Sequence, residues 1–238
     1  MAQTVFHSAD TRGPASHGWL ESFHTFSFAK YYNPERMNFG ALRVLNDDDI
    51  AGGRGFGEHP HDNMEIITIP FEGALKHEDS MGNEAVVHAG EIQVMSAGTG
   101  IYHKEFNANP DERVKLLQIW LFPNQRNVTP RYDQQSFDLD ANINELVQIL
   151  SPDADDAGVW IHQNAWFSLG KFTAEKELTY KIKGAGNGVY VFALKGTVTA
   201  GGQDLQERDA VGIWDTTEFK IKTAPGTQVL LMEVPMCI

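Results

Sequence analysis

The sequence lacks the features that would place it in several large classes of protein. It has a single cysteine, Cys237, so no internal disulfide can form, and a reducing compartment suits it. No apolar run approaches the roughly 20 residues that span a bilayer, and residues 1–8 lack the charged and apolar regions of a signal peptide. These absences predict a cytoplasmic protein that does not associate with a membrane.

Basic residues are also scarce, with 19 Lys and Arg against 32 Asp and Glu, which gives a formal net charge of −13. A field of this sign repels phosphate groups, so direct binding to nucleic acid is not expected. Hydrophobic residues make up 42% of the 238 residues and supply a substantial core. This length suits one large all-β domain or two domains of about 120 residues each, which we expect to act as a monomer.

Long helical stripes are missing, and short β-rich segments follow one another with glycine or asparagine turns about every 8–12 residues, as in a sandwich or barrel. The predicted strands cover residues 41–45, 64–71, 74–78, 85–88, 91–95, 114–122, 159–162, 165–171, 177–182, 188–194, 197–200, 204–205, 210–213, 218–221 and 228–234. We interpret 123–158 as a connection with a possible short helix over 141–146. The aromatic-rich stretch 19–32 is interpreted as a strand or arm that packs over the barrel.

Histidine is absent after His162, whereas two pairs of metal-capable residues stand in the first half of the chain. His59 and His61 form one pair, and His103 and Glu105 form the other. On an extended strand, side chains two residues apart leave the same face about 6.6 Å apart, so two such strands can converge on one point. Three imidazoles and a carboxylate are a mixed donor set that suits a divalent transition metal.

Other polar residues carry weaker signals. The glycine-rich segment 52–57 has the composition of a phosphate-binding loop, but such a loop opens a helix, whereas this one leads into a strand with histidines. A Ser-x-x-Lys pattern at 27–30 lacks its β-lactamase partner motifs and is attributed to chance. We expect the remaining histidines that we considered to be structural or exposed (His24, His77 and His88) or to lie at the surface (His7 and His162).

Two stretches resemble the cupin motifs. Residues 53–73 contain the first, with one extra residue between Glu65 and Gly73, and residues 90–107 contain the second, with Ser96 where proline is commoner. More specifically, the chain resembles the pirin family of bicupins and its bacterial members with quercetin 2,3-dioxygenase activity. The segments that carry this resemblance are 17–20, 22–29, 40–44, 55–61, 95–101 and 103–105. Asp62 departs from the arginine of many members and removes a positive charge beside the metal.

The resemblance implies an all-β bicupin, made of two jelly-roll β-barrel domains. A metal-binding cupin domain over 1–135 and a degenerate cupin domain without a metal site over 136–238 are expected. The metal ligands carried over from the family are His59, His61, His103 and Glu105. Glu65, the usual cupin carboxylate, is then not the main ligand, and it also lies about 13 Å along an extended chain from His61.

The implied activity is metal-assisted dioxygenation of a small aromatic substrate, a flavonol or enediol, by O₂, with ring cleavage and release of CO from quercetin. Iron(II) is the expected metal, and copper, nickel, cobalt, zinc or manganese can also enter such a site. Glu105 is the expected proton acceptor. The alternative is an iron-binding, redox-sensing regulatory module without physiological turnover, as pirins of higher organisms are thought to act on transcription factors.

Overall fold

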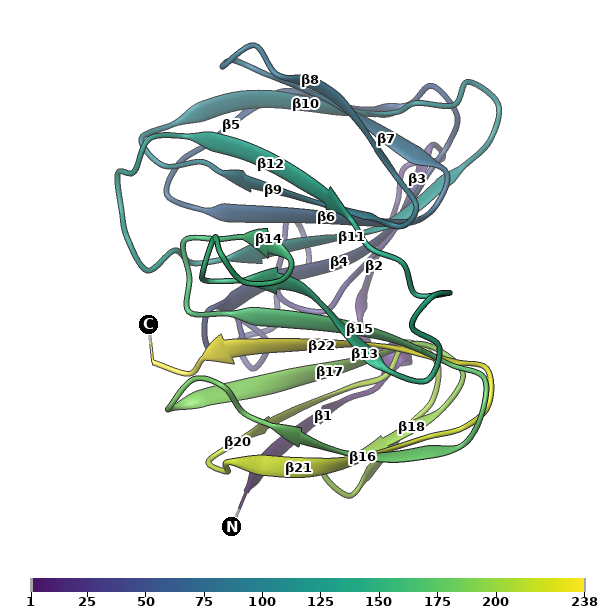
Figure 1. Ribbon diagram of the computed structural model, residues 1–238. Helices are drawn as coiled ribbons and strands as arrows, with labels where there is room; N and C mark the ends of the chain where they lie inside the picture. The colour runs from purple at the N-terminus through teal and green to yellow at the C-terminus, as the bar shows by residue number, and fades with distance from the viewer. Residues whose placement is uncertain (1, 238) are drawn as a thin grey trace.

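Two similar halves stack on one another in the computed structural model, which describes residues 2–237 (Figure 1). Each half pairs one seven-stranded sheet with one four-stranded sheet, and the two large sheets face each other in the middle of the molecule. The expected all-β bicupin is therefore confirmed. Each half is a jelly roll of two facing sheets that hydrogen bonds do not join into a closed barrel within the described residues.

Among residues 2–237 the one helical element is the 3-10 turn η1 (Ala9–Thr11). None of the described residues forms a helix that is long and apolar enough to cross a membrane.

The first half has a large sheet of order β12-β9-β6-β11-β4-β3-β2 and a small sheet of order β5-β10-β7-β8. All of its strand pairs are antiparallel. Its strands are β2 (Gly13–Ser16), β3 (Leu20–His24), β4 (Leu42–Ile50), β5 (Gly55–His61), β6 (Glu65–Glu72), β7 (Ala74–Asp79), β8 (Glu84–His88), β9 (Glu91–Ser96), β10 (Ile101–Asn107), β11 (Val114–Leu121) and β12 (Arg131–Ser136).

The second half has a large sheet of order β1-β20-β17-β22-β15-β13-β14 and a small sheet of order β16-β21-β18-β19. Its strands are β1 (Gln3–His7), β13 (Leu146–Ser151), β14 (Val159–Trp160), β15 (Trp166–Phe172), β16 (Lys176–Lys181), β17 (Asn187–Lys195), β18 (Val198–Ala200), β19 (Gln203–Leu205), β20 (Ala210–Trp214), β21 (Glu218–Thr223) and β22 (Thr227–Pro235). The N-terminal strand β1 therefore completes the sheet of the opposite half, where it pairs with β20. The division of the chain into domains at residue 135 stays a prediction.

Two expectations about the middle of the chain are wrong. Residues 123–158 are not merely a connection, because β12 and β13 lie within them. The possible helix over 141–146 is absent, since 141–144 form a turn and β13 starts at Leu146. β12 is a polar edge strand that pairs with β9 through its backbone, so its sequence carries little of the apolar alternation that marks a strand. The aromatic stretch 19–32 does contain a strand, β3, which pairs with β4.

The largest hydrophobic core lies between the two large sheets and joins the halves. Leu45 and Ile119 contribute to it from the first half, and Phe167, Tyr190 and Leu230 contribute from the second. These side chains alternate with residues that face into each jelly roll, so both faces of the large sheets are buried. Burial at about 25 cal/mol per Å² of apolar surface makes this interface a main source of stability.

The interiors of the two jelly rolls differ. The second is filled by one large apolar cluster that includes Phe172, Val191 and Ile221. The first holds smaller apolar clusters near its ends, with buried polar side chains between them, among them Thr68 and Gln118. Buried polar groups are costly unless they are bonded or used, so the interior of the first half is where a functional site is expected.

Candidate metal centre

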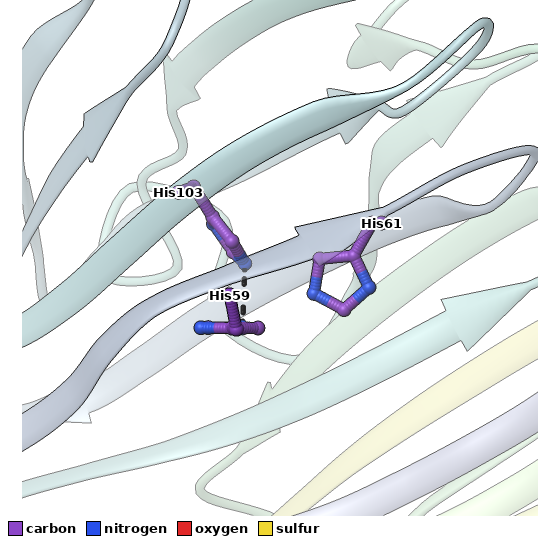
Figure 2. A group of neighbouring side chains, drawn as sticks. All are labelled: His59, His61 and His103. Atoms are coloured by element: carbon purple, nitrogen blue, oxygen red, sulfur yellow. Dashed lines mark hydrogen bonds between the residues drawn. The ribbon is translucent and has the colours of Figure 1, made fainter.

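Three histidines from two neighbouring strands meet at one point of the first half. His59 and His61 lie on β5, and β10 runs antiparallel with His103 directly opposite His59. One nitrogen of each ring lies within 4.8 Å of the other two, and the ring centroids are 4.4 to 4.9 Å apart. Figure 2 shows the three rings gathered around a common space, with the His59–His103 contact dashed.

Glycines let β5 approach β10 closely enough for this convergence. A Cβ at Gly55 would lie 2.1 Å from the carbonyl oxygen of Glu105, and one at Gly52 would lie 2.2 Å from that of Pro110. No side chain fits at such distances. The glycine-rich segment 52–57 thus allows close backbone packing before the first histidine.

The separation of His59 and His103 suits two ligands of one ion. Their Nε2 atoms are 2.9 Å apart, close to the roughly 3 Å expected for two nitrogens that each lie about 2.0–2.1 Å from a metal and meet it at a right angle. His59 Nδ1 lies 2.7 Å from the Gly57 carbonyl oxygen and donates its proton there. In a neutral imidazole with its proton on Nδ1, Nε2 is the atom that carries the lone pair, and in His59 this atom faces the cluster.

The imidazoles of His61 and His103 are neutral at neutral pH. Burial, reinforced by the neighbouring imidazoles, lowers the pKa of His61 to about 4 and that of His103 to about 3. Neutral imidazole is the form that binds a metal. Neutral rings present nitrogen lone pairs to a metal ion, whereas protonated rings would repel it.

Glu105 adjoins the histidines but belongs to a different set of contacts. The pairing of β5 with β10 is bulged between His103 and Glu105. Gln118 Nε2 donates to one Glu105 oxygen at 3.0 Å, and Thr68 Oγ1 donates to the other at 3.4 Å. The Glu105 carboxylate forms a second possible ligand group with His103 and His77, separate from the three-histidine cluster. The structure thus brings the three expected histidines together and places Glu105 beside them.

His77 is a neighbour whose place at the site the sequence reading missed. It is fully buried, as a structural residue would be, but its ring centroid is 5.3 Å from that of His103. Its Nε2 donates to Asp79 Oδ2 at 3.1 Å, and the Asn83 side chain holds the same oxygen at 2.8 Å. His77 and Asp79 are another pair two positions apart, and this spacing is the signal that could have revealed them.

The two rings His77 and His103 have complementary unpaired nitrogens. Because His77 donates through Nε2, its Nδ1 is an acceptor, and no hydrogen-bond partner for it exists among the described residues. His103 Nδ1 is likewise buried without a partner in residues 2–237. A metal on His103 Nε2 requires the proton on Nδ1. His77, held by Asp79, is the ring that lies next to His103 on the side of β7.

Outside this centre, the histidines that we expected to be structural or exposed match that expectation: His24 is buried against Asn46 and His88 is exposed. His7 is a correction, because it is 8% exposed and its Nδ1 lies 2.7 Å from the Tyr190 hydroxyl. Burial lowers its pKa to about 4. His7 is buried because β1 crosses into the second half, and no local sequence pattern indicates this crossing. His162 is half-buried.

A groove leads to the centre from the N-terminal strands. Its outer part has a volume of about 790 Å³ and ends in exposed residues such as His17 and Lys30. Its inner part is a cavity of about 80 Å³ bounded by His59 and Glu105. The two parts share the lining residues Leu20, His24, Phe28 and Phe56, so the inner cavity lies directly against the outer groove.

Comparisons with known proteins agree with this architecture. A family model described as Pirin matches residues 5–121, and one described as Quercetinase C-terminal cupin domain matches residues 148–234. A quercetin 2,3-dioxygenase of Escherichia coli K12 is 44% identical over 227 residues, covering 95% of this chain and 96% of that protein. This chain belongs to the pirin family. A pirin-like protein of Caulobacter vibrioides is 38% identical over 94% of this chain and 96% of its own.

A solved structure of a related pirin contains a divalent metal ion. The bacterial pirin YhhW of Escherichia coli, in complex with nickel(II), matches with a TM-score of 0.92 and 42% identity over 98% of this chain and 99% of its own. In the chain described here, three imidazoles beside a buried carboxylate are donors suited to one divalent transition metal ion. The expected membership of the pirin bicupins is thus confirmed.

Proposed function

We propose that this pirin is a metal-dependent dioxygenase that acts on a flavonol or a related enediol. The observation that carries the proposal is the cluster of three imidazoles, one of which, His59, borders with Glu105 a cavity at the inner end of an aromatic-walled groove. Relatives named quercetin 2,3-dioxygenase, at 44% and 39% identity, support the same activity class.

In this proposal His59, His61 and His103 hold one divalent metal, and Glu105 is the fourth ligand and the proton acceptor. Iron(II) is the proposed occupant, although the same donors also bind copper, nickel, cobalt, zinc or manganese. When bound, such an ion lowers the pKa of a substrate hydroxyl. The first half alone carries the site, because the interior of the second half is packed with apolar side chains.

Glu105 takes the hydroxyl proton of the substrate. Its carboxylate is held by Gln118 at 3.0 Å and by Thr68 at 3.4 Å, so it stays oriented when a substrate enters. Trp120 packs edge-on against His61 at 4.9 Å and against Phe28 at 5.3 Å, between the histidines and the groove. These rings keep water from the reacting carbon atoms, which prevents hydrolytic side reactions.

The proposed reaction on quercetin balances with O₂ as the one co-substrate. Two carbon–carbon bonds of the central ring break, and the carbon between them leaves as CO with its own hydroxyl oxygen. Both atoms of O₂ remain in the ester product. The proton that Glu105 removes from that hydroxyl returns to the product, so Glu105 ends the cycle as a carboxylate.

Oxygen uptake across a small panel of flavonols and enediols tests the proposal. Protein reconstituted separately with iron(II), nickel(II), copper(II), cobalt(II), manganese(II) and zinc(II) should bind about one ion per chain, and at least one form should consume O₂ with a flavonol. A chain that binds metal but shows no turnover with any substrate would instead favour an iron-binding regulatory module. A second metal site that survives loss of His59 and His61 would contradict the single site.

A further inference from the structure

A band of polar side chains crosses the inner face of the large sheet in the first half. Thr68 on β6, Gln118 on β11, Asn46 on β4 and His24 on β3 are successive cross-strand neighbours. All four are buried. Gln118 holds Glu105, and His24 Nδ1 bonds to Asn46 Oδ1 at 2.8 Å. This row occupies the position where the second half has an apolar core.

Asp48 lies one step along β4 from this row and faces the same cavity. Ser22, its cross-strand neighbour on β3, donates to Asp48 Oδ1 at 2.5 Å. Its other cross-strand neighbour is the apolar Leu116. No donor within residues 2–237 bonds to Asp48 Oδ2, yet that oxygen is not completely enclosed, and the side chain is among those that bound the inner cavity. One carboxylate oxygen is thus left for a ligand.

Because Asp48 is buried, a hydrogen bond from a ligand hydroxyl would stabilise its carboxylate. The residue is 4% exposed, and burial, with smaller contributions from Asp47 and Glu105, raises its pKa to about 7. A buried carboxylate with an unpaired oxygen is costly. A ligand that donates a hydrogen bond to Oδ2 removes part of that cost, whereas a ligand without a donor leaves it in place.

The size of the cavity limits what reaches Asp48. A cavity of roughly 150 Å³ holds a benzene ring, and a water molecule takes about 30 Å³ in the liquid. The inner space of about 80 Å³ therefore admits the hydroxylated edge of a ring but not a whole ring. The outer groove of about 790 Å³, with aromatic walls that include Trp19 and Tyr31, has room for the remainder.

We propose that Asp48 is a specificity-determining residue that accepts a hydrogen bond from a ligand hydroxyl next to the one at Glu105. The ligand class is a flat catechol or enediol with two adjacent hydroxyl groups at one edge. A flavonol has a carbonyl beside its reacting hydroxyl and no donor for Asp48, so among the proposed substrates Asp48 favours the enediol. One hydroxyl lies at Glu105 and the candidate metal ligands, and its neighbour donates to Asp48 Oδ2. This inference rests on the proposed function for the position of the first hydroxyl, but it concerns binding alone.

The experiment measures the affinity of zinc-loaded protein for 4-phenylcatechol and for its monomethyl ether, which lacks one donor, by calorimetry without oxygen. The pH is kept well above the raised pKa of Asp48, so that its carboxyl is ionised. The ratio of the two dissociation constants is compared between wild type and Asp48→Leu. If Asp48 accepts a hydrogen bond from the second hydroxyl, the preference for the catechol should fall by about 10- to 100-fold in the variant. This is the usual contribution of a hydrogen bond to a charged group. Metal coordination contributes to both proteins and cancels in the comparison.

Two further variants make the experiment decisive. Asp48→Asn keeps the shape and a neutral acceptor, so the preference should fall by about 3- to 10-fold, and this variant replaces Asp48→Leu if the latter does not fold. Asp49→Asn removes a carboxylate from the next position on β4, where the side chain faces away and pairs with Arg113, and should leave the preference unchanged.

An unchanged preference in both Asp48 variants would overturn the assignment, as would a wild-type protein that binds neither compound. Neither result depends on turnover. Failure of the dioxygenase proposal is seen separately, as absence of O₂ uptake by a protein that still prefers the catechol.

Discussion

The Nε2 atoms of His59 and His103 face each other at 2.9 Å across the β5–β10 pair. His61 completes the cluster from one side-chain step along β5. Since one ion would bind all three nitrogens, loss of either His61 or His103 should abolish tight metal binding, and the double variant should be little worse than either single variant. Metal titration of His61→Ala, His103→Ala and the double variant measures this non-additivity. Independent, additive losses would indicate two weak sites.

The Asp79–His77 pair should affect metal affinity without being a ligand. Asp79→Asn removes the charge that fixes the His77 tautomer, and second-shell changes of this kind weaken binding by about 10–100-fold. A competition titration with a chelator gives the value. Glu78→Gln is the matched control, because Glu78 pairs with Lys76 and Lys104 on the outer side of β7. Equal affinity in the wild type and Asp79→Asn would remove His77 from the site.

Glu65 should make stability depend on pH. Burial raises its pKa from 4.5 to about 7, against the hydrogen bond from Ser96. Between these values the folded protein holds a proton that the unfolded chain has lost, so this contribution to stability is complete below pH 4.5 and is lost as pH rises to about 7. The shift corresponds to roughly 3 kcal/mol.

Glu65→Gln cannot lose a proton and should lack this dependence. Urea unfolding of both proteins below and above the window measures it: the wild type should lose up to roughly 3 kcal/mol relative to the variant as pH rises. A constant difference between the two proteins across the window would mean that Glu65 ionises normally in the folded state.

The N-terminal strand should stabilise the second half. The Tyr190 hydroxyl is hydrogen-bonded to His7 Nδ1 across 183 positions of sequence at 2.7 Å, and both side chains are buried. Tyr190→Phe leaves His7 without a partner, at a cost of about 1–3 kcal/mol in the free energy of unfolding. Tyr32→Phe, at a tyrosine that is 73% exposed, is the control. Equal stability of both variants would show that the β1 contact contributes little.

Much of the site could be predicted because its signal is local. The alternation of side chains along β5 and β10 makes His59 and His61, and His103 and Glu105, pairs on one face, and this is visible in the sequence. His77 and Asp79 follow the same rule but were not singled out, since a carboxylate two positions from a histidine is common. Glu105 lies apart from the three-histidine cluster, and the β5–β10 pairing is bulged between His103 and Glu105, a feature that has no simple sequence signature.

The parts of the fold that could not be predicted are long-range. β1 joins a sheet whose other strands begin at residue 146, and only the completed sheet makes His7 a buried residue. Asp48 belongs to an acidic run that is typical of a solvated turn, yet strand β4 continues through it. Every second residue of that run then faces the interior, so Asp48 is buried while Asp49 pairs with Arg113.

Oxygen consumption by Glu105→Gln at saturating metal tests the central claim most directly. Wild-type protein with quercetin should consume O₂ and release CO in equal amounts. The variant keeps the size of the side chain and should retain metal, but its rate should fall by about 10²–10⁴-fold, the usual contribution of a positioned general base. A metal-saturated variant that turns over at the wild-type rate would contradict the role of Glu105. A wild-type protein that consumes no O₂ with any metal would contradict the dioxygenase itself.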